Sequence, residues 1–436
     1  MSDTNLQISV PTVSIETHGC KLNQSDSFGF VRELETAGFK LVSRDEPADV
    51  YIVNTCTVTH IADRKGRQAL RSAKRLNPNA TIVATGCYAE RDPEALKSLD
   101  EVDLVVGNSG KFELVKKIVE IQAERNVPCS TGDDSVINGS SIVRSRPMIK
   151  IQEGCNQICA YCIVPKVRGR ERSIDPGKII SEIKRYSLDG YKEIVLTGTQ
   201  LGSYGFDLED IDLVGLIQQI LLNTDVPRIR VSSLQPQEIS DRLLELWTDS
   251  RLCPHFHIPL QSASDRILKM MRRRYTNVQY ANSINKIRKK IDNASITTDV
   301  IVGFPQETNQ EFEETYNMCD QVGFTDVHVF PYSERPGTSA VYFGNKVDAI
   351  EKTSRVRRLL NRCEIHSLEY RTKFIGTVRP VLWERQTYVS GVSRWQGLTD
   401  NYLKVITVDS EDLRNQITLA NLKELDDSGT YKASNL

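Results

Sequence analysis

Hydrophobic positions in the first third of the chain occur in short runs, and each run is followed by a stretch with helical spacing. The runs are VSIETHGC, DVYIVNTC, TIVATGC and VDLVVGN, and the helical stretches lie near residues 28–37, 62–76, 93–99 and 112–121. Strand–helix alternation of this kind favours a small parallel sheet that is covered by helices on both faces. We therefore predict an α/β domain over residues 10–124.

A polar segment rich in Gly, Ser and Asp follows, and we interpret residues 125–143 as a linker. Six further strand patterns then alternate with helical stretches such as 176–188 and 311–322; they are MIKIQEGC, EIVLTGT, RIRVSSL, HFHIPLQS, ITTDVIVGFP and DVHVFPYS. Six strand–helix units in succession favour a partial TIM-like (β/α)6 barrel, with its chemistry at the carboxyl ends of the strands. We assign this barrel to residues 144–370, and a doubly wound open sheet is the alternative.

The last part of the chain changes pattern again. After a charged helical stretch near residues 349–374, four short alternating runs follow, VRPVLWER, TYVSGVSRW, YLKVITVD and QITLANLKEL. Short strands of this kind predict a small antiparallel β-barrel over residues 371–436. The predicted fold class is therefore α/β, with this small barrel at the carboxyl end.

Composition narrows the function only in part. The 436 residues include 56 Lys+Arg and 57 Asp+Glu, so the overall charge neither demands nor excludes a polyanionic partner, and a nucleic-acid contact must be local. The polar start MSDTNLQISVP and the absence of a long apolar run predict a soluble, cytoplasmic protein with no membrane partner. Ten cysteines are too few and too irregularly placed for a secreted disulfide framework, which favours metal binding by those that cluster.

Three cysteines crowd into the stretch GCNQICAYC, namely Cys155, Cys159 and Cys162. A structural zinc site needs four ligands, usually from a second cysteine pair or two histidines, and no such pair follows. Three thiolates on one short loop suit an iron–sulfur cluster better. A cluster held in this way has one iron without a protein ligand.

Three further cysteines each follow one of the first three predicted strands; they are Cys20, Cys56 and Cys87. Because the carboxyl ends of parallel strands lie on one edge of a sheet, these distant thiols can converge at one point. The other cysteines fit no cluster pattern, and we interpret them as small buried apolar residues: Cys129, Cys253, Cys319 and Cys363.

The spacing Cys155-x3-Cys159-x2-Cys162, directly after the first barrel strand, resembles the radical S-adenosylmethionine (SAM) superfamily. In that family the open iron chelates the amino and carboxylate groups of SAM, and an electron from the cluster cleaves SAM to give a 5′-deoxyadenosyl radical. Further motifs resemble the methylthiotransferases over nearly the whole chain: THGCKLNQSDS, VNTCTVT, TGCYAE, GCNQICAYCIVPKVRGRERS, GTQLGSYG, HIPLQSASDRILKMMRR, DVIVGFPQET and RPGTSA. The small terminal barrel resembles their RNA-binding TRAM domain.

This resemblance implies two [4Fe-4S] clusters and SAM as cofactors, with the second cluster on Cys20, Cys56 and Cys87. It also implies that the radical abstracts hydrogen from an unreactive carbon and that the second cluster delivers a methylated sulfur to this carbon. The run NTCTVTHIADRKGRQALRSAKR most resembles the enzymes that modify N6-threonylcarbamoyladenosine next to the tRNA anticodon. The alternatives are isopentenyladenosine at the same place, an aspartate of a ribosomal protein, or a non-catalytic iron–sulfur sensor that binds RNA.

The resemblance further suggests which residues bind SAM. Tyr161, which precedes the last cysteine of the loop, is expected near the adenine. Glycines after one strand and the GFP turn after another are expected in the SAM pocket, although a plain strand-to-helix turn also uses glycine: Gly198, Gly202, Gly205, Gly303, Phe304 and Pro305.

Histidines and basic residues near these motifs are further candidates. His255 and His257 lie two apart on a strand and share one face, and His257 is the candidate for the pocket. Four basic residues of KVRGRER follow the cysteine loop closely, which favours contact with the SAM carboxylate or substrate phosphates, with a solvated cationic run as the alternative: Lys166, Arg168, Arg170 and Arg172. Of these, we assign Arg168 and Arg170 to the SAM site.

A stripe of arginines follows Cys56 at three- and four-residue spacing, with Ala69, Ala73 and Leu76 on the opposite side of the helix: Arg64, Arg67, Arg71 and Arg75. We predict that this stripe contacts the tRNA anticodon stem-loop, and an ordinary solvent face is the alternative. In the terminal barrel, half of four aromatic residues are expected to stack on bases and the rest to be core: Trp383, Tyr388, Trp395 and Tyr402. We expect a monomer whose reductant is a flavodoxin-like or ferredoxin-like protein.

Overall fold

The computed structural model describes residues 10–125, 145–389 and 391–436. It divides into two compact units, the first formed by residues up to 143 together with 163–169, and the second by residues 144–162 together with 170–436. The predicted linker, residues 125–143, lies outside the described ranges except for residue 125, and Cys129 lies outside them as well. The finer boundary predicted at residue 371 stays a prediction.

The first unit is built on a parallel sheet of five strands in the order β2-β1-β3-β4-β5. The strands are β1 (Thr12–Thr17), β2 (Lys40–Leu41), β3 (Val50–Thr55), β4 (Thr81–Gly86) and β5 (Leu104–Val106). Every residue of β3 and β4 is buried, as expected for central strands that are covered on both faces.

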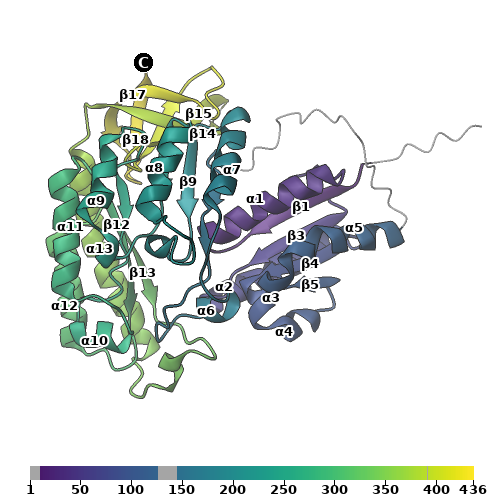
Figure 1. Cartoon of the computed structure of the whole chain (residues 1–436), viewed down its shortest axis with the longest axis horizontal. Coiled ribbons are helices and arrows are strands. Elements are labelled where there is room, and N and C mark those ends of the chain that lie inside the picture. The colour runs from purple at the N-terminus through teal and green to yellow at the C-terminus, as the bar shows by residue number, and fades with distance from the viewer. Residues whose placement is uncertain (1–9, 126–144, 390) are drawn as a thin grey trace, which may run out of the picture. The chain divides into compact units, whose positions relative to one another are not determined.

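Helices cover both faces of this sheet (Figure 1). One apolar cluster joins the sheet to α1 (Lys21–Thr36) and α5 (Leu114–Glu124), and a second cluster joins its other face to α2 (His60–Leu76), α3 (Cys87–Arg91) and α4 (Pro93–Lys97). The short helix α6 (Val164–Val167) also belongs to this unit and packs on Cys87 through Val167. The predicted strand–helix alternation is confirmed here.

The second unit contains six parallel strands in chain order. Two sheets of three strands, β10-β9-β6 and β11-β12-β13, are joined by parallel bridges between Ile229 and Leu252 and between Ser233 and His257. The strands are β6 (Met148–Lys150), β9 (Glu193–Thr197), β10 (Arg228–Val231), β11 (His255–His257), β12 (Ser295–Val302) and β13 (Asp326–Pro331). Because a doubly wound sheet would reverse this order, the partial (β/α)6 barrel is confirmed and the open-sheet alternative is excluded.

An outer layer of helices packs on this barrel through one large apolar cluster. Its helices are α7 (Pro176–Leu188), α8 (Leu213–Asn223), α9 (Asp241–Leu244), α11 (Asn277–Lys290), α12 (Asn309–Val322) and α13 (Ala349–Thr372), while α10 (Asp265–Met270) contributes Leu268. A two-stranded antiparallel pair, β7 (Gln152–Glu153) and β8 (Arg172–Ser173), lies next to β6 in sequence.

The carboxyl-terminal strands close into a small barrel in the order β14-β15-β16-β18-β17. They are β14 (Val378–Val389), β15 (Val392–Thr399), β16 (Lys404–Val408), β17 (Ile417–Leu425) and β18 (Tyr431–Asn435). The barrel is antiparallel as predicted, except that β16 and β18 pair in parallel. Trp383 and Trp395 fill its core.

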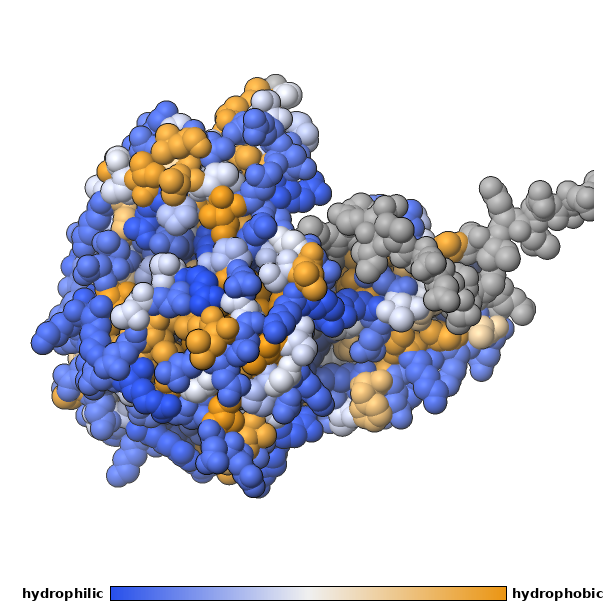
Figure 2. Space-filling view, turned by 45° about the horizontal axis from the view of Figure 1, so that its top comes forward, coloured by the Kyte–Doolittle hydropathy of each residue, from blue (hydrophilic) through white to orange (hydrophobic). Residues whose placement is uncertain are grey.

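The surface and the helices of the described residues show few extended apolar features. The face in Figure 2 is mostly hydrophilic, with apolar patches interspersed. None of the helices in the described ranges combines the length and the apolar character that a membrane crossing needs.

Candidate functional site

Three cysteines lie at the ends of three neighbouring strands of the first unit. Cys56 and Cys87 directly follow their strands, and Cys20 lies three residues after its strand. Cys20 caps the amino end of α1 after β1, Cys56 follows β3, and Cys87 begins α3 after β4. The parallel register aligns Thr17 with Asn54 and Thr55 with Gly86, so these strands end at the same edge of the sheet. The convergence predicted from the strand order therefore occurs.

Two of these thiols are buried, and the third is exposed. Cys56 and Cys87 are 3% and 6% exposed, whereas Cys20 is open to solvent. Burial raises the pKa of the Cys56 thiol to about 12, and the neighbouring thiols of Cys20 and Cys87 add to this increase. Burial likewise raises the pKa of the Cys87 thiol. Two buried thiols and one exposed thiol fit an iron–sulfur cluster, since bound metal ions favour the thiolate form that burial alone disfavours.

Glycines directly precede Cys20 and Cys87, and they allow the backbone there to lie close to the neighbouring strand end that carries Cys56. Gly19 has φ +94°, and a Cβ atom there would lie 2.6 Å from the Cβ and 2.7 Å from the Sγ of Cys56. Gly86 has φ +90°, and its Cβ would lie 2.4 Å from Oδ1 of Asn54 and 2.5 Å from the carbonyl oxygen of Thr55. Both positions therefore require glycine.

The buried amide of Asn23 and the half-buried amide of Asn108 connect the segments that carry the three thiols. The side chain of Asn23 donates to the carbonyl oxygens of His18 at 2.8 Å and Thr55 at 2.9 Å. Asn108 donates from Nδ2 to Cys87 Sγ at 3.4 Å and to the carbonyl oxygen of Val167 at 2.8 Å. These hydrogen bonds hold the loops in place, and most of them end on backbone carbonyl oxygens rather than on cysteine sulfurs.

Arg168 lies in this group and not in the barrel, where the sequence led us to expect it. Its guanidinium donates to Oδ1 of Asn23 and, at 3.2 Å, to Oδ2 of Asp26, and its side chain is nearly buried. The reason is that residues 163–169 fold onto the first unit, where the carboxylate of Asp26 also accepts a bond from Lys111. Arg170, by contrast, belongs to the second unit and is exposed.

The second set of cysteines occupies the loop after β7. Cys159 is 8% exposed, and Cys155 and Cys162 are half-buried. The loop is anchored by backbone bonds from Ala160 N to Met271 O at 3.0 Å and from Ala340 N to Ala160 O at 2.8 Å. Burial raises the pKa of the Cys155 thiol, with the nearby Cys159 as an additional cause. Three thiols on one anchored loop again fit a cluster better than a zinc ion.

A half-buried arginine approaches this loop. Arg273 Nη1 donates to Cys159 Sγ at 3.4 Å, and Nη2 donates to Gln235 Oε1 at 3.0 Å. Its guanidinium lies 5.1 Å from the ring centroid of Tyr275, whose hydroxyl bonds to the carbonyl oxygens of Pro259 and Leu260. Arg273 thus supplies a fixed positive charge beside the cysteine loop.

Polar side chains next to Arg273 form a connected group at the carboxyl ends of the barrel strands. Gln152 Oε1 accepts the backbone N–H groups of Thr199 and Gln200, each at 2.9 Å. Gln200 bonds to both Gln235 and Glu238. Burial raises the pKa of the Glu238 carboxyl to about 7, although hydrogen bonds oppose the shift. This group can bind polar atoms of a ligand.

Glycines of the TGTQLGSYG stretch line the same region. A Cβ on Gly202 would lie 2.0 Å from Cδ of Glu238, and a Cβ on Gly198 would lie 3.1 Å from Oε1 of Gln152. Gly205 has φ +90° and would place a Cβ 1.8 Å from the carbonyl oxygen of Ile211. Gly198 and Gly202 therefore adjoin the polar group, whereas Gly205 serves a tight turn.

The GFP turn after β12 contributes an apolar wall. Phe304 is fully buried in a cluster with Tyr332 and Ala340, against which Tyr161 packs. Gly303 has φ +69° and donates its N–H to Glu307 Oε2 at 2.6 Å, and Pro305 is buried. Phe304 is therefore part of the buried cluster on which Tyr161 packs, and ligand contact by Gly303, Phe304 and Pro305 stays a prediction.

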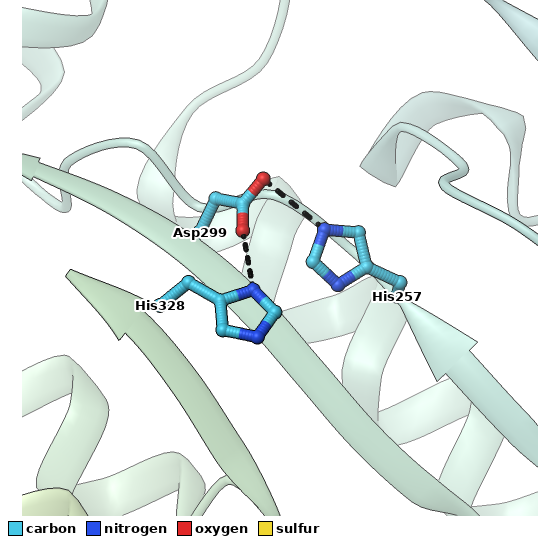
Figure 3. A group of neighbouring side chains, drawn as sticks. All are labelled: His257, Asp299 and His328. Atoms are coloured by element: carbon cyan, nitrogen blue, oxygen red, sulfur yellow. Dashed lines mark hydrogen bonds and ion pairs between the residues drawn. The ribbon is translucent and has the colours of Figure 1, made fainter. Parts of the chain in front are cut away.

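His257 contacts a carboxylate and a second histidine inside the barrel (Figure 3). Its Nε2 lies 3.2 Å from Asp299 Oδ2, and His328 Nδ1 lies 3.0 Å from Asp299 Oδ1. The hydrogen bonds and charges of the two imidazoles outweigh burial and hold the pKa of the Asp299 carboxyl below its usual range. His255, the first residue of β11, instead stacks on Tyr402, and the ring centroids lie 4.4 Å apart.

The arginine stripe on α2 is largely exposed. Arg64, Arg71 and Arg75 are exposed, and Ala69 and Ala73 are buried on the opposite side as predicted. Arg67 differs, because its Nη1 donates to the hydroxyl of Tyr88 at 2.7 Å and its side chain is half-buried. Leu76 at the helix end is exposed and is not part of the apolar side.

The four aromatic residues of the small barrel have different environments. Trp383 and Trp395 are fully buried, Tyr388 is exposed, and Tyr402 packs between His255 and the guanidinium of Arg230. Tyr402 is 36% exposed, but its ring already stacks on His255 and lies under Arg230, so Tyr388 is the better candidate for stacking on a base.

Several residues at these sites were not among those we predicted, although three of them lie within the quoted motifs: Asn23, Arg273 and Asp299. Asn23, Asn108 and Arg273 contact or connect cysteine loops, and Asp299 and His328 meet His257. Asp299 and His328 had a detectable signal, since each is an ionisable residue within a predicted strand. Arg273 is the last residue of the HIPLQSASDRILKMMRR motif, in which we assigned it no role.

Family profiles match two parts of the chain. The profile described as Uncharacterized protein family UPF0004 matches residues 12–107, and that of the Radical SAM superfamily matches residues 149–319. Among solved structures, the radical S-adenosylmethionine methyltransferase TsrM from Kitasatospora setae has a TM-score of 0.55 at 14% identity, covering 76% of this chain and 77% of that one. This likeness concerns the fold.

Relatives at higher identity span most of the chain. The Threonylcarbamoyladenosine tRNA methylthiotransferase MtaB of Bacillus subtilis is 37% identical over 416 residues, which are 93% of this chain and 92% of the relative. The protein of the same name from Aquifex aeolicus is 42% identical over 358 residues, 80% of this chain and 86% of the relative. The tRNA-2-methylthio-N(6)-dimethylallyladenosine synthase of Staphylococcus haemolyticus is 30% identical over 441 residues, 96% of this chain and 86% of the relative.

Proposed function

Because the chain belongs to the radical SAM methylthiotransferase family, we propose that it converts N6-threonylcarbamoyladenosine next to the tRNA anticodon to its 2-methylthio derivative. The observation that carries the proposal is the presence of two sets of three cysteines, one at the strand ends of each unit. The names of the relatives with 37% and 42% identity support this choice of adenosine.

In this proposal, Cys155, Cys159 and Cys162 hold one [4Fe-4S] cluster, and Cys20, Cys56 and Cys87 hold the other. When bound, the clusters supply the electron that cleaves SAM and the sulfur that is transferred. The protein's own task is to place the reactants and to exclude water from them.

The residues around the barrel cysteines are suited to holding SAM. Arg273 offers a half-buried guanidinium that complements a carboxylate, and the linked amides of Gln200 and Gln235 offer donors and acceptors for hydroxyl groups. A side chain at position 202 would clash with Glu238, so the glycine there allows Glu238 to remain in this group. Tyr161 packs against the buried cluster that contains Phe304, which holds an aromatic ring beside the loop for adenine contact.

The first unit is suited to contact the tRNA. Arg64, Arg71 and Arg75 present exposed guanidinium groups on α2, which begins four residues after Cys56. Tyr388 offers a stacking surface on the small barrel. The proposed enzyme acts as a monomer in the cytoplasm, where its tRNA substrate is found, and receives electrons from a flavodoxin-like or ferredoxin-like protein.

A substrate comparison tests the proposed reaction. Reconstituted, reduced protein is incubated with SAM and with tRNA that carries either threonylcarbamoyladenosine or dimethylallyladenosine, and the nucleosides are analysed by mass spectrometry. We expect a gain of one methylthio group on the first tRNA. Turnover on the second tRNA alone would replace the proposed substrate with that named for the Staphylococcus haemolyticus relative, and SAM cleavage without any methylthio product on either would contradict a transferase.

The arginine stripe gives a separate prediction for tRNA binding. The combined change Arg64→Ala, Arg71→Ala and Arg75→Ala is expected to weaken tRNA binding and to reduce the slope of log K against log salt by about 0.7–0.9 for each phosphate that the variant no longer neutralises. Lys116→Ala is the control, because Lys116 is an exposed cation on α5, which covers the other face of the sheet. Fluorescence anisotropy at several salt concentrations measures both, and an unchanged slope in the triple variant would show that the stripe is only a solvent face.

A further inference from the structure

A cluster of potential metal ligands lies inside the barrel and includes none of the cysteines. It consists of His257 on β11, Asp299 on β12 and His328 on β13, and one ligand atom of each lies within 4.8 Å of the others. These strands are neighbours in one parallel sheet, and the register pairs Asp299 directly with His328. The three side chains therefore meet because of the sheet itself and not through a flexible loop.

The alternation of side chains places this cluster on the inner face of the barrel. Phe256, Val300 and Val327 belong to the apolar cluster that the strands share with the outer helices. Since neighbouring residues of a strand face opposite sides, His257, Asp299 and His328 face away from those helices. They point toward the space enclosed by the curved sheet, as Figure 3 shows for their mutual orientation.

The spacing of the ligand atoms suits a metal ion. The distances from Asp299 are 3.2 Å to His257 Nε2 and 3.0 Å to His328 Nδ1. For metal–ligand bonds of about 2.1 Å, two adjacent ligand atoms are about 3.0–3.4 Å apart in octahedral or tetrahedral geometry. The first distance ends on Oδ2 and the second on Oδ1, so each imidazole nitrogen lies at this spacing from one oxygen of the Asp299 carboxylate.

The orientation of His257 is fixed by a second contact. Its Nδ1 lies 3.0 Å from the hydroxyl of Thr297, and the same hydroxyl lies 3.1 Å from Nε2 of His255. This leaves Nε2 of His257 directed at Asp299. Histidines that bind metals commonly have their other ring nitrogen held by such a partner, which sets the tautomer and the ring orientation.

From these observations we propose that His257, Asp299 and His328 bind one divalent first-row transition-metal ion, such as Mn2+, Fe2+ or Zn2+. Two imidazoles and one carboxylate form a donor set that these metals accept, and three protein ligands leave positions open for water or for an oxygen atom of a ligand. The half-exposed ring of His328 gives an ion access to the site. This proposal rests on the geometry of the barrel strands and is independent of the proposed tRNA reaction.

Mn2+ binding to the full-length protein tests the site. Mn2+ is the probe because it favours carboxylate and imidazole ligands, whereas thiolates favour softer metals. It is titrated anaerobically into protein with both clusters reconstituted and oxidised, and free Mn2+ is followed by its electron paramagnetic resonance signal. We expect one tightly bound Mn2+ per chain, with nitrogen couplings from imidazole in pulsed spectra.

Variants decide whether these residues hold the ion. Asp299→Asn and His328→Ala are each expected to weaken Mn2+ binding by at least about tenfold, since even partners of the ligands contribute this much. His366→Ala is the matched control, because His366 also pairs with carboxylates, those of Asp320 and Glu369, but lies on α13. Iron content checks that each variant retains its clusters.

Two outcomes would overturn the proposal. One is the absence of stoichiometric Mn2+ binding to the wild-type protein, which would leave the three residues as a hydrogen-bonded group. The other is equally tight binding to Asp299→Asn or His328→Ala with unchanged nitrogen couplings, which would place the ion elsewhere. His328→Ala keeps the test decisive if Asp299→Asn fails to fold, because the His328 side chain is 54% exposed.

Discussion

Replacement of Cys56 by alanine is expected to abolish methylthiolation of tRNA while 5′-deoxyadenosine continues to form from SAM. Cys56 is buried at the end of β3 between the loops of Cys20 and Cys87, so no other described cysteine can take its place. The barrel cysteines lie in the other unit, where their loop has its own backbone anchors at Met271 and Ala340. Loss of one set therefore leaves the other intact.

The two products and the iron content are measured on the same sample. The variant is expected to lose the iron of one cluster, to give methylthio product at the level of a reaction without enzyme, and to retain deoxyadenosine formation. Cys363→Ala is the control, because Cys363 is a buried cysteine on α13 that belongs to neither set. The converse change, Cys159→Ala, is expected to stop both products, and continued methylthiolation in Cys56→Ala would remove the first set from the mechanism.

The sequence was sufficient to predict the edge at which Cys20, Cys56 and Cys87 meet. Two facts determine it: each cysteine follows a strand, and parallel strands connected by helices end on the same side. Neither fact depends on side-chain packing, which is why the prediction holds. The six-strand order of the barrel was predictable for the same reason.

What depends on tertiary contacts was not predictable from the pattern. Helix α1 begins at Lys21, seven residues before the predicted start. The prediction missed this first part because Asn23, Asp26 and Ser27 are polar, although they are buried and hydrogen-bonded in the structure. A search for apolar periodicity reads such a turn as a loop. Arg168 is a similar case, since its partner Asp26 is 142 residues away in the sequence.

The parallel pairing of β16 and β18 also escaped the sequence pattern. Alternating apolar positions specify which face of a strand is buried, but they do not specify which neighbour the strand joins. The same limit applies to His257, whose face was predicted, whereas its contacts with Asp299 and His328 required the register of three strands.

Replacement of Gly19 by alanine is expected to remove the amino-terminal cluster nearly as completely as loss of a cysteine, although no ligand changes. The φ of +94° at Gly19 is a conformation that costs a residue with a side chain about 1–3 kcal/mol. The new methyl group would also lie 2.6 Å from Cβ of Cys56, a distance that real side chains do not adopt. Since Cys20 is the next residue, relief of this clash must displace one of two cysteines.

Gly29→Ala separates this effect from a general response to a methyl group. Gly29 lies within α1 of the same unit, and nothing is within 4 Å of a Cβ added there. Because glycine in a helix interior is about 1 kcal/mol less favourable than alanine, Gly29→Ala is expected to raise thermal stability slightly and to leave iron content and activity unchanged. Gly19→Ala is expected to lose the iron of one cluster and the methylthio product while it still forms 5′-deoxyadenosine. Full iron loading of Gly19→Ala would mean that the cysteines tolerate a wider spacing than the described structure has, and the close approach of Gly19 to Cys56 would then have no part in cluster binding.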